Sequence, residues 1–361
     1  ASIADLHTAY ESLAVDRYGE DEASKFWMGT GNSDEEPWDG AGADVPSTRV
    51  PLYPLPACYL PSGATQRLNN VEPRNIRMAE DLKSGKWDGL FCVAMRTLDT
   101  GRVSRIGTMM RLISAEEQLG YDGSVLRVAV ECRAEQLVHI DSIENSSDLK
   151  EGSDEYRIAN VRPFELDEGS NASGLPMQLA RDLSDDYCAV RSMYIEEDGV
   201  GAKELPPFAA DAIRRDIMDL TSDSFSSPSC FWDAAEMWQM LCATVREAHR
   251  SDLYSNLNEV MIDAAAKKGG PLRLPVKREH LSVEVQMKLR RMELEAMENY
   301  EATHMDPCLQ FQALLSCRGW TQSMKLLSRM ILRERRRLEA KKSLKGVLQK
   351  GPATDELCPQ R

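Results

Sequence analysis

The spacing of apolar residues changes near residue 172, and this change constrains the fold more than any other feature of the chain. Before it, short apolar segments indicate strands, because side chains on a strand alternate between two faces. The alternation is clearest in 125–132, where the apolar face is Leu126, Val128, Val130 and Cys132. We expect that strand to cover one face of a core. The predicted strands are 50–55, 90–95, 106–114, 125–132 and 156–164.

Beyond residue 172, apolar residues recur at the spacing of a helical face. Ser227 can cap a helix that has Pro228 at its first position. The three apolar faces are Phe231, Ala235, Trp238, Cys242 and Val245; Leu281, Val285, Leu289, Met292 and Ala296; and Leu326, Leu327, Met330, Ile331 and Leu338. A further helix interrupts the strands. It enters at Glu72, has Pro73 in its first turn and runs through Leu82. Strands followed by helices indicate an α+β fold.

The length of 361 residues exceeds what one hydrophobic core usually organises, so we expect two lobes with tails. The predicted parts are an acidic extension 1–46, a β lobe 47–170, a helical lobe with insertions 171–350 and a tail 351–361. The extension carries eleven acidic residues against two basic ones, too polar to bury a core of its own.

The net charge of −14 disfavours a nucleic-acid partner, because phosphate binding depends on clustered basic residues. The segment 325–350 is the exception, with ten basic and two acidic residues. It is either a solvated helix face or a partner site. The apolar runs fall short of the roughly 20 residues that cross a bilayer, so we expect membrane contact to be peripheral at most.

Nine cysteines are scattered without a Cys-x-x-Cys pair, which is typical of buried thiols in a reducing compartment. The chain begins at Ala1 rather than at methionine. We interpret this as removal of a targeting peptide and expect a plastid or mitochondrion, with the cytosol as the alternative.

The sequence contains no constellation typical of catalysis or metal binding. The five histidines are isolated and form no His-x-x-x-His pair. The adjacent carboxylates at 116–117 and 185–186 are expected to be solvated. We therefore expect no enzyme activity, no catalytic residue, no metal and no cofactor.

Several short motifs follow one another in a recognisable order. They are VPLYPLP at 50–56, LP at 60–61 before Gly63, VEPR at 71–74, IGTMMRL at 106–112, LRVAVEC at 126–132 and YRIANV at 156–161. Together they resemble the N-terminal, substrate-binding domain of the Lon protease family, and 309–348 is similar to its closing helices. The resemblance implies a PUA-like pseudo-barrel of mostly antiparallel strands followed by a helical bundle.

The chain also departs from the family pattern. Asn75 stands where an aromatic residue is usual, and insertions lie at 140–156 and 195–305. The Lon family's proteolysis needs a Gly-x-x-x-x-Gly-Lys-[Ser/Thr] phosphate loop and a Ser-Lys peptidase domain, and neither occurs in these 361 residues. Gly85-Lys86 follows Ser84 without the preceding glycine of such a loop, so we expect a turn there.

Candidate contact residues lie around the barrel motifs and in the basic helix. Prolines near residue 54 are expected to shape the barrel mouth, and the Glu-Pro-Arg motif has either a structural or a binding role. The predicted contact residues are Tyr53, Pro54, Leu55, Pro56, Tyr59, Glu72, Arg74, Trp87, Gly107, Arg335, Arg336 and Arg337. We expect the three arginines to face outward, toward carboxylates of a partner.

The leading interpretation is a non-catalytic protein-binding module that acts in protein recognition, proteostasis or complex assembly. The alternative is a permanent accessory subunit of a larger organellar complex. RNA binding through the PUA relationship is disfavoured by the acidic charge, and a ubiquitin-ligase receptor by the missing cysteine pairs.

Overall fold

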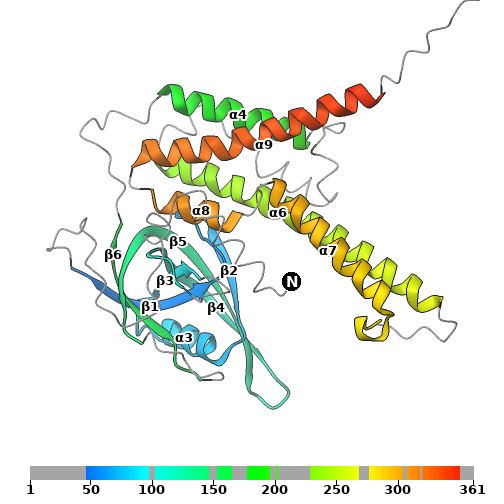
Figure 1. The fold of residues 1–361 in the computed structure, drawn as a ribbon. Helices are drawn as coiled ribbons and strands as arrows, with labels where there is room; N and C mark the ends of the chain where they lie inside the picture. Colours follow the sequence, from blue (N-terminus) through cyan, green and yellow to red (C-terminus); the bar gives the residue numbers. More distant parts are fainter. Residues whose placement is uncertain are drawn as a thin grey trace, which may run out of the picture. The chain divides into compact units, whose positions relative to one another are not determined.

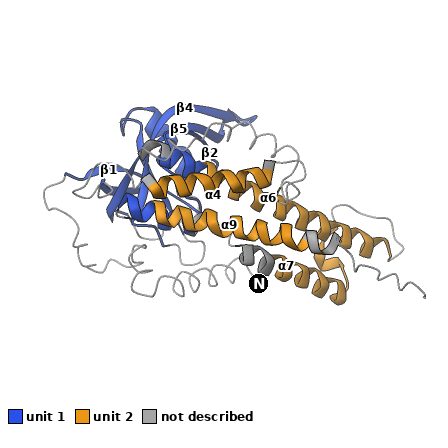
Figure 2. Ribbon diagram, turned by 90° about the horizontal axis from the view of Figure 1, so that it is seen from above, with its two compact units in different colours: residues 1–175, 227–236, 308–323 blue, residues 176–226, 237–307, 324–361 orange. Residues whose placement is uncertain are grey.

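The computed structural model describes residues 46–96, 102–145, 153–164, 177–195, 201, 228–267, 276–303, 307–317 and 319–349. The predicted acidic extension up to residue 45, the tail 351–361 and the cap residue Ser227 lie outside the described residues. The chain divides into two compact units (Figure 2). Unit 1 lies within residues 1–175, 227–236 and 308–323, and unit 2 within 176–226, 237–307 and 324–361.

Unit 1 is built on a barrel of mostly antiparallel strands (Figure 1). The strands are β1 (Thr48–Leu55), β2 (Thr65–Asn70), β3 (Leu90–Met95), β4 (Ile106–Leu119), β5 (Val125–Ile143) and β6 (Arg157–Pro163). They lie in the order β2-β5-β4-β3-β1-β6, and a further pairing of β5 with β6 closes a ring. The parallel pair is β1 with β3. The predicted α+β class is confirmed.

Strand β5 is the longest and has neighbours on both edges. It pairs with β4 along nearly its whole length. On its other edge, Val128 to Arg133 pair with β2, and Val138 to Ile143 pair with β6. The two shorter strands therefore share one edge of β5 end to end.

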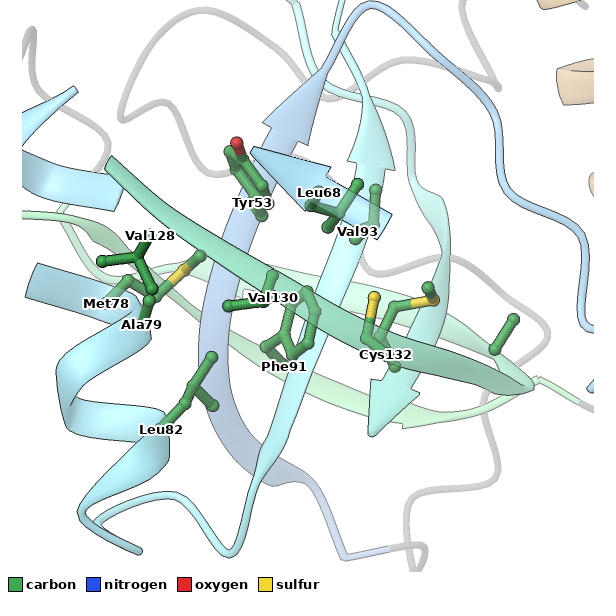
Figure 3. Packing of buried hydrophobic residues seen from close by; sticks show 12 residues of the cluster. Tyr53, Leu68, Met78, Ala79, Leu82, Phe91, Val93, Val128, Val130 and Cys132 are labelled. Carbon is green, nitrogen blue, oxygen red and sulfur yellow. The ribbon is translucent and has the colours of Figure 1, made fainter. Parts of the chain in front are cut away.

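Helix α3 (Pro73–Lys83) covers one hydrophobic core of the barrel (Figure 3). Proline at its first position suits a helix start, because the missing N–H would have no partner there. Its buried face is Met78, Ala79 and Leu82. These side chains pack with a cluster that includes Phe91 and Val130.

A second core lies on the opposite face of the same strands. Cys92 and Ala94 belong to it, whereas their neighbours Phe91 and Val93 belong to the core under α3. Because β3 is buried on both faces, it is a continuous apolar run rather than an alternating one.

Short helical segments from distant parts of the chain complete unit 1. Helix α8 (Pro307–Leu315) is tied to the barrel by Gln312, whose Nε2 donates to the carbonyl of Ile106 over 3.2 Å. Helices α6 (Pro228–Ala266) and α9 (Trp320–Gln349) both begin in this unit. There the Phe231 and Trp320 rings meet edge to face, with centroids 5.6 Å apart.

Unit 2 is helical. It holds α4 (Met177–Ile195), the greater part of α6 and α9, the 3-10 turn Arg278–His280 and α7 (Val283–Thr303). A core that includes Leu257 and Met261 of α6 and Leu289 of α7 joins those two helices. The predicted helical faces are largely buried, as expected for amphipathic helices in a bundle.

The strand predictions were right in position but incomplete in extent. Strands β4 and β5 run beyond the predicted 106–114 and 125–132, and their far ends form a hairpin. Leu126, predicted to face the core, is exposed on that hairpin, where the barrel no longer covers it. Strand β2 was missed because Gln66, Asn69 and Asn70 make its sequence polar.

Gly107 permits the close approach of β4 to β3. A Cβ built there would lie 2.7 Å from Cys92 Sγ and 2.8 Å from the Val93 carbonyl oxygen. We expect Gly107→Ala to destabilise the protein by about 1–3 kcal/mol, because the backbone of β3 has to move. Urea unfolding measures this, with the exposed β4 substitution Ser114→Ala as control. Equal unfolding midpoints for the two variants would contradict the packing role.

Candidate functional site

A cavity of about 290 Å³ lies in unit 1 where several strands end. The second half of β1 and the residue after it form one wall, through Leu52, Tyr53, Pro54, Leu55 and Pro56. Leu52 and Tyr53 are buried, Pro54 and Leu55 are half-buried, and Pro56 is exposed. This wall is largely apolar.

The end of β2 and the start of α3 form a second wall, through Asn69, Val71, Glu72, Arg74 and Asn75. Glu72 occupies the cap position of α3, and its side chain makes no capping hydrogen bond. Its carboxylate instead accepts a hydrogen bond from Arg74 Nε over 2.7 Å. The two charges of the Glu-Pro-Arg motif therefore form a local ion pair.

The end of β3 and the start of β6 supply Arg96, Tyr156 and Arg157. The backbone N–H of Arg96 donates to the Leu55 carbonyl over 2.8 Å, which holds the end of β3 beside β1. Arg157 pairs with Leu52 in the antiparallel ladder of β6 and β1.

Tyr156 is positioned by a buried carboxylate behind the cavity. Its hydroxyl donates to Asp81 Oδ2 over 2.5 Å and accepts from Trp87 Nε1 over 2.8 Å. Lys86 Nζ binds the same Oδ2 atom at 2.6 Å, and Arg77 lies 3.3 Å from Oδ1. Burial opposes ionisation of Asp81, but the hydrogen bonds from Lys86 and Tyr156 outweigh it and lower the pKa of this carboxyl.

The loop after α3 brings Lys86 and Trp87 to Asp81. Gly85 and Asp88 have φ values of +84° and +51°, in the left-handed region that glycine adopts without strain. The chain can thereby reverse tightly, and Lys86 N donates back to the Asp81 carbonyl over 3.2 Å. The prediction of a turn at Gly85 is confirmed.

Half of the predicted contact residues meet at this cavity. Those that line it are Tyr53, Pro54, Leu55, Pro56, Glu72 and Arg74. The ring of Tyr53 is buried in the α3 core, so only its cavity-facing surface is open to a ligand. A binding role for the six residues stays a prediction.

Three predicted residues near the barrel lie outside the cavity wall. Trp87 is half-buried, and it reaches the cavity through Tyr156. Tyr59 is also half-buried, and its carbonyl accepts from Thr108 Oγ1 over 2.5 Å. Gly107 is buried between β3 and β4. The structure gives these three packing roles.

The basic residues 335–337 lie on α9 in unit 2, and they do not all face outward as expected. Arg337 makes two hydrogen bonds to Glu334, of 2.6 and 2.8 Å, and Glu334 is only 2% exposed. Arg335 binds Asp186 of α4 at 2.7 Å. Arg336 alone of the three is exposed. A buried carboxylate needs a paired cation, which explains why Arg337 turns inward.

Sequence reasoning missed Arg96, Tyr156 and Arg157 as site residues. Arg96 directly follows the apolar run of β3, and the other two open β6. That location marks a strand end, but strand ends far apart in sequence meet only when the barrel closes.

Within the described ranges, no three histidine, cysteine or acidic side chains converge as metal ligands would. Along the same part of the chain, no helix is both long enough and apolar enough to cross a membrane.

No protein-family model matches the chain, and no curated protein does. Solved structures similar to part of it include a Lon N-terminal domain protein from Xanthomonas campestris, which is 18% identical in sequence. The match covers 52% of this chain and 82% of that chain, with a TM-score of 0.29. The N-terminal domain of a Mycobacterium avium complex Lon protease shows 11% identity, coverage of 56% and 98%, and a TM-score of 0.31. Both are Lon N-terminal domains. The motifs of this sequence resemble the same family.

We expect Asp81→Asn to lower the free energy of unfolding by about 1–3 kcal/mol at pH 7, because a buried carboxylate that accepts several hydrogen bonds is lost. The folded-state pKa of Asp81 lies below its unfolded value, so its contribution is present above about pH 4 and is lost as pH falls through the folded pKa. Urea unfolding at pH 7 and at pH 3 should show that the difference in unfolding free energy between variant and wild type is smaller at pH 3.

The matched control for this substitution is Asp88→Asn, because Asp88 is an exposed aspartate in the adjoining loop and asparagine tolerates its positive φ. It should be nearly neutral at both pH values. If the difference in unfolding free energy between Asp81→Asn and the wild type is the same at both pH values, the charge of Asp81 is not the stabilising feature.

Proposed function

We propose that this protein is a non-catalytic module that binds extended polypeptide segments at the cavity of unit 1. The observation that carries the proposal is the position of the cavity between two open strand edges. Beyond Leu52, β1 pairs with β3 alone, and β2 pairs with β5 alone among the described strands. An open edge offers unpaired backbone groups to an incoming chain.

The two edges are not equivalent. Pro54 has no N–H, so the β1 edge offers fewer donors and is protected from strand pairing. The β2 edge has no proline, and its polar side chains keep it solvated. We infer that a bound segment pairs along β2 and places side chains against the apolar wall of β1.

The chemistry of the lining favours binding over covalent catalysis. The residues that line the cavity include no serine, cysteine, histidine or lysine. Its one carboxylate, Glu72, is paired with Arg74, and the Tyr156 hydroxyl is bound to Asp81. The motif resemblance to a substrate-binding domain points to the same kind of function. A role in protein recognition, proteostasis or complex assembly would follow from such a site.

A second candidate function, a permanent accessory subunit of a larger complex, is favoured by an exposed apolar face on α7. Val283, Met287 and Leu294 are exposed. Their spacings of four and seven residues place them on one side of the helix. An apolar face of this kind is typical of a stable interface.

The cavity proposal predicts that Val71→Trp weakens binding of an unfolded polypeptide at least tenfold. Val71 lines the cavity and is 62% exposed, so a larger side chain can obstruct the site without disturbing the core. Leu119→Trp, at a 58% exposed hairpin position, is the matched control. Fluorescence anisotropy with labelled, permanently unfolded casein measures the affinity. Equal affinities for both variants, or no binding by the wild type, would refute the proposal.

The accessory-subunit alternative predicts a partner that stays bound in constant stoichiometry through a salt series. The double substitution Val283→Ser and Met287→Ser should release it, as measured by native mass spectrometry of the tagged full chain. Glu284→Ser, an exposed polar position on the same helix, should retain it. A monomeric mass for the wild type would exclude a permanent partner.

A further inference from the structure

The cavity of unit 1 has a cationic lining, although the whole chain has a net charge of −14. Arg74, Arg96 and Arg157 line it, against the single carboxylate of Glu72. A guanidinium group stays protonated at any physiological pH. The charge of the cavity is therefore opposite in sign to the charge of the protein.

The Glu72 carboxylate is already used by Arg74, which lies two residues along the same helix start. This pair compensates itself. No other carboxylate lines the cavity, so nothing in its lining balances the charge of Arg96. A carboxylate on a ligand would supply the missing charge.

The side chain of Arg96 has a buried donor that lacks an acceptor within the described part of the chain. Its backbone is held on one side by the hydrogen bond to Leu55 and on the other by a bridge to Val103. Its Nε atom is buried and has no hydrogen-bond partner among the described residues. A buried donor without an acceptor is unfavourable, and pairing it with a charged oxygen relieves that penalty.

Apolar side chains line the same cavity and suit an apolar neighbour of such a carboxylate. They are Leu52, Leu55 and Val71. Burial raises the pKa of Tyr53 to about 12, so its phenol stays neutral and does not oppose an anion in the cavity. A ligand that matches both the arginines and these apolar side chains carries a carboxylate beside an apolar group.

We propose that the cavity recognises an acidic side chain flanked by apolar residues within an extended peptide, with Arg96 as the residue that binds the carboxylate. This inference rests on the proposed function, because it names the ligand class of the same site. An internal side chain is favoured over a C-terminal carboxylate because the cavity borders open strand edges, along which a chain can continue in both directions.

The acidity of the protein favours a single carboxylate over a polyanion. A nucleic acid brings many phosphates near the surface, and the net charge of −14 repels them. One carboxylate that enters the cavity meets mainly the arginines, because charges more than about 10 Å away are screened at physiological salt.

The test uses fluorescein-labelled peptides with a central aspartate between two valines and an amidated C-terminus, compared with the same peptide carrying asparagine. Fluorescence anisotropy with the full chain should show the aspartate peptide binding about tenfold more tightly, the effect of one charge-assisted hydrogen bond. A third peptide carries the asparagine and a free C-terminal carboxylate, and it should bind no better than its amidated form.

Arg96→Gln should remove the preference for aspartate over asparagine, measured as the ratio of the two dissociation constants. Arg96→Lys keeps the charge but loses the planar fork, so part of the preference should remain. Arg133→Gln, an exposed arginine of β5 outside the cavity wall, is the control and should keep the full preference. Thermal melting confirms that each variant is folded.

Comparing the aspartate and asparagine peptides on the wild-type protein tests the inference even if the Arg96 variants unfold. Equal affinity for the aspartate and asparagine peptides would overturn the inference. Tighter binding of the free C-terminal carboxylate would also overturn it, in favour of terminal recognition. Binding of unfolded casein that Val71→Trp weakens would in both cases leave the proposed function standing, so the two ideas fail separately.

Discussion

The architecture depends on the length of β5 and on the way its edges are shared. Most of the nineteen residues of β5 pair with β4 on one edge, and the other edge pairs with β2 and then with β6. Because β6 closes the ring only with the second half of β5, β2 keeps one edge open among the described strands. The end of β1 is open for the same reason. The cavity lies between these edges as a direct result of the pairing.

The polar contacts around the cavity hold its side chains in place. Asp81 fixes Tyr156 and Lys86, and Glu72 fixes Arg74. Each carboxylate near the site thus has a cation or hydroxyl partner, whereas Arg96 Nε has none among the described residues. This preorganisation favours the proposed binding role, because side chains that had to be ordered on binding would lower the affinity.

Local sequence signals predicted the elements well where one physical cause dominates. The spacing of Phe231, Ala235 and Trp238 predicted a buried helical face, and proline at position 73 predicted the start of α3. Strand β2 was not predicted, because its pairing with β5 makes it a strand and its sequence lacks apolar alternation. Arg337 was expected to face outward. It turns inward because its partner Glu334 becomes buried when α4 and α9 pack, and this burial cannot be read from the local sequence.

The sequence alone determined the α+β class, the strand and helix periods, the turn at Gly85 and the proline-rich segment that became one wall of the cavity. These depend on backbone propensity and on alternation over a few residues. The tertiary structure alone decided that Arg96, Arg157 and Tyr156 stand beside that segment. Their positions follow from strand register and ring closure, which join residues about 40 to 100 positions apart, and no local pattern encodes that distance.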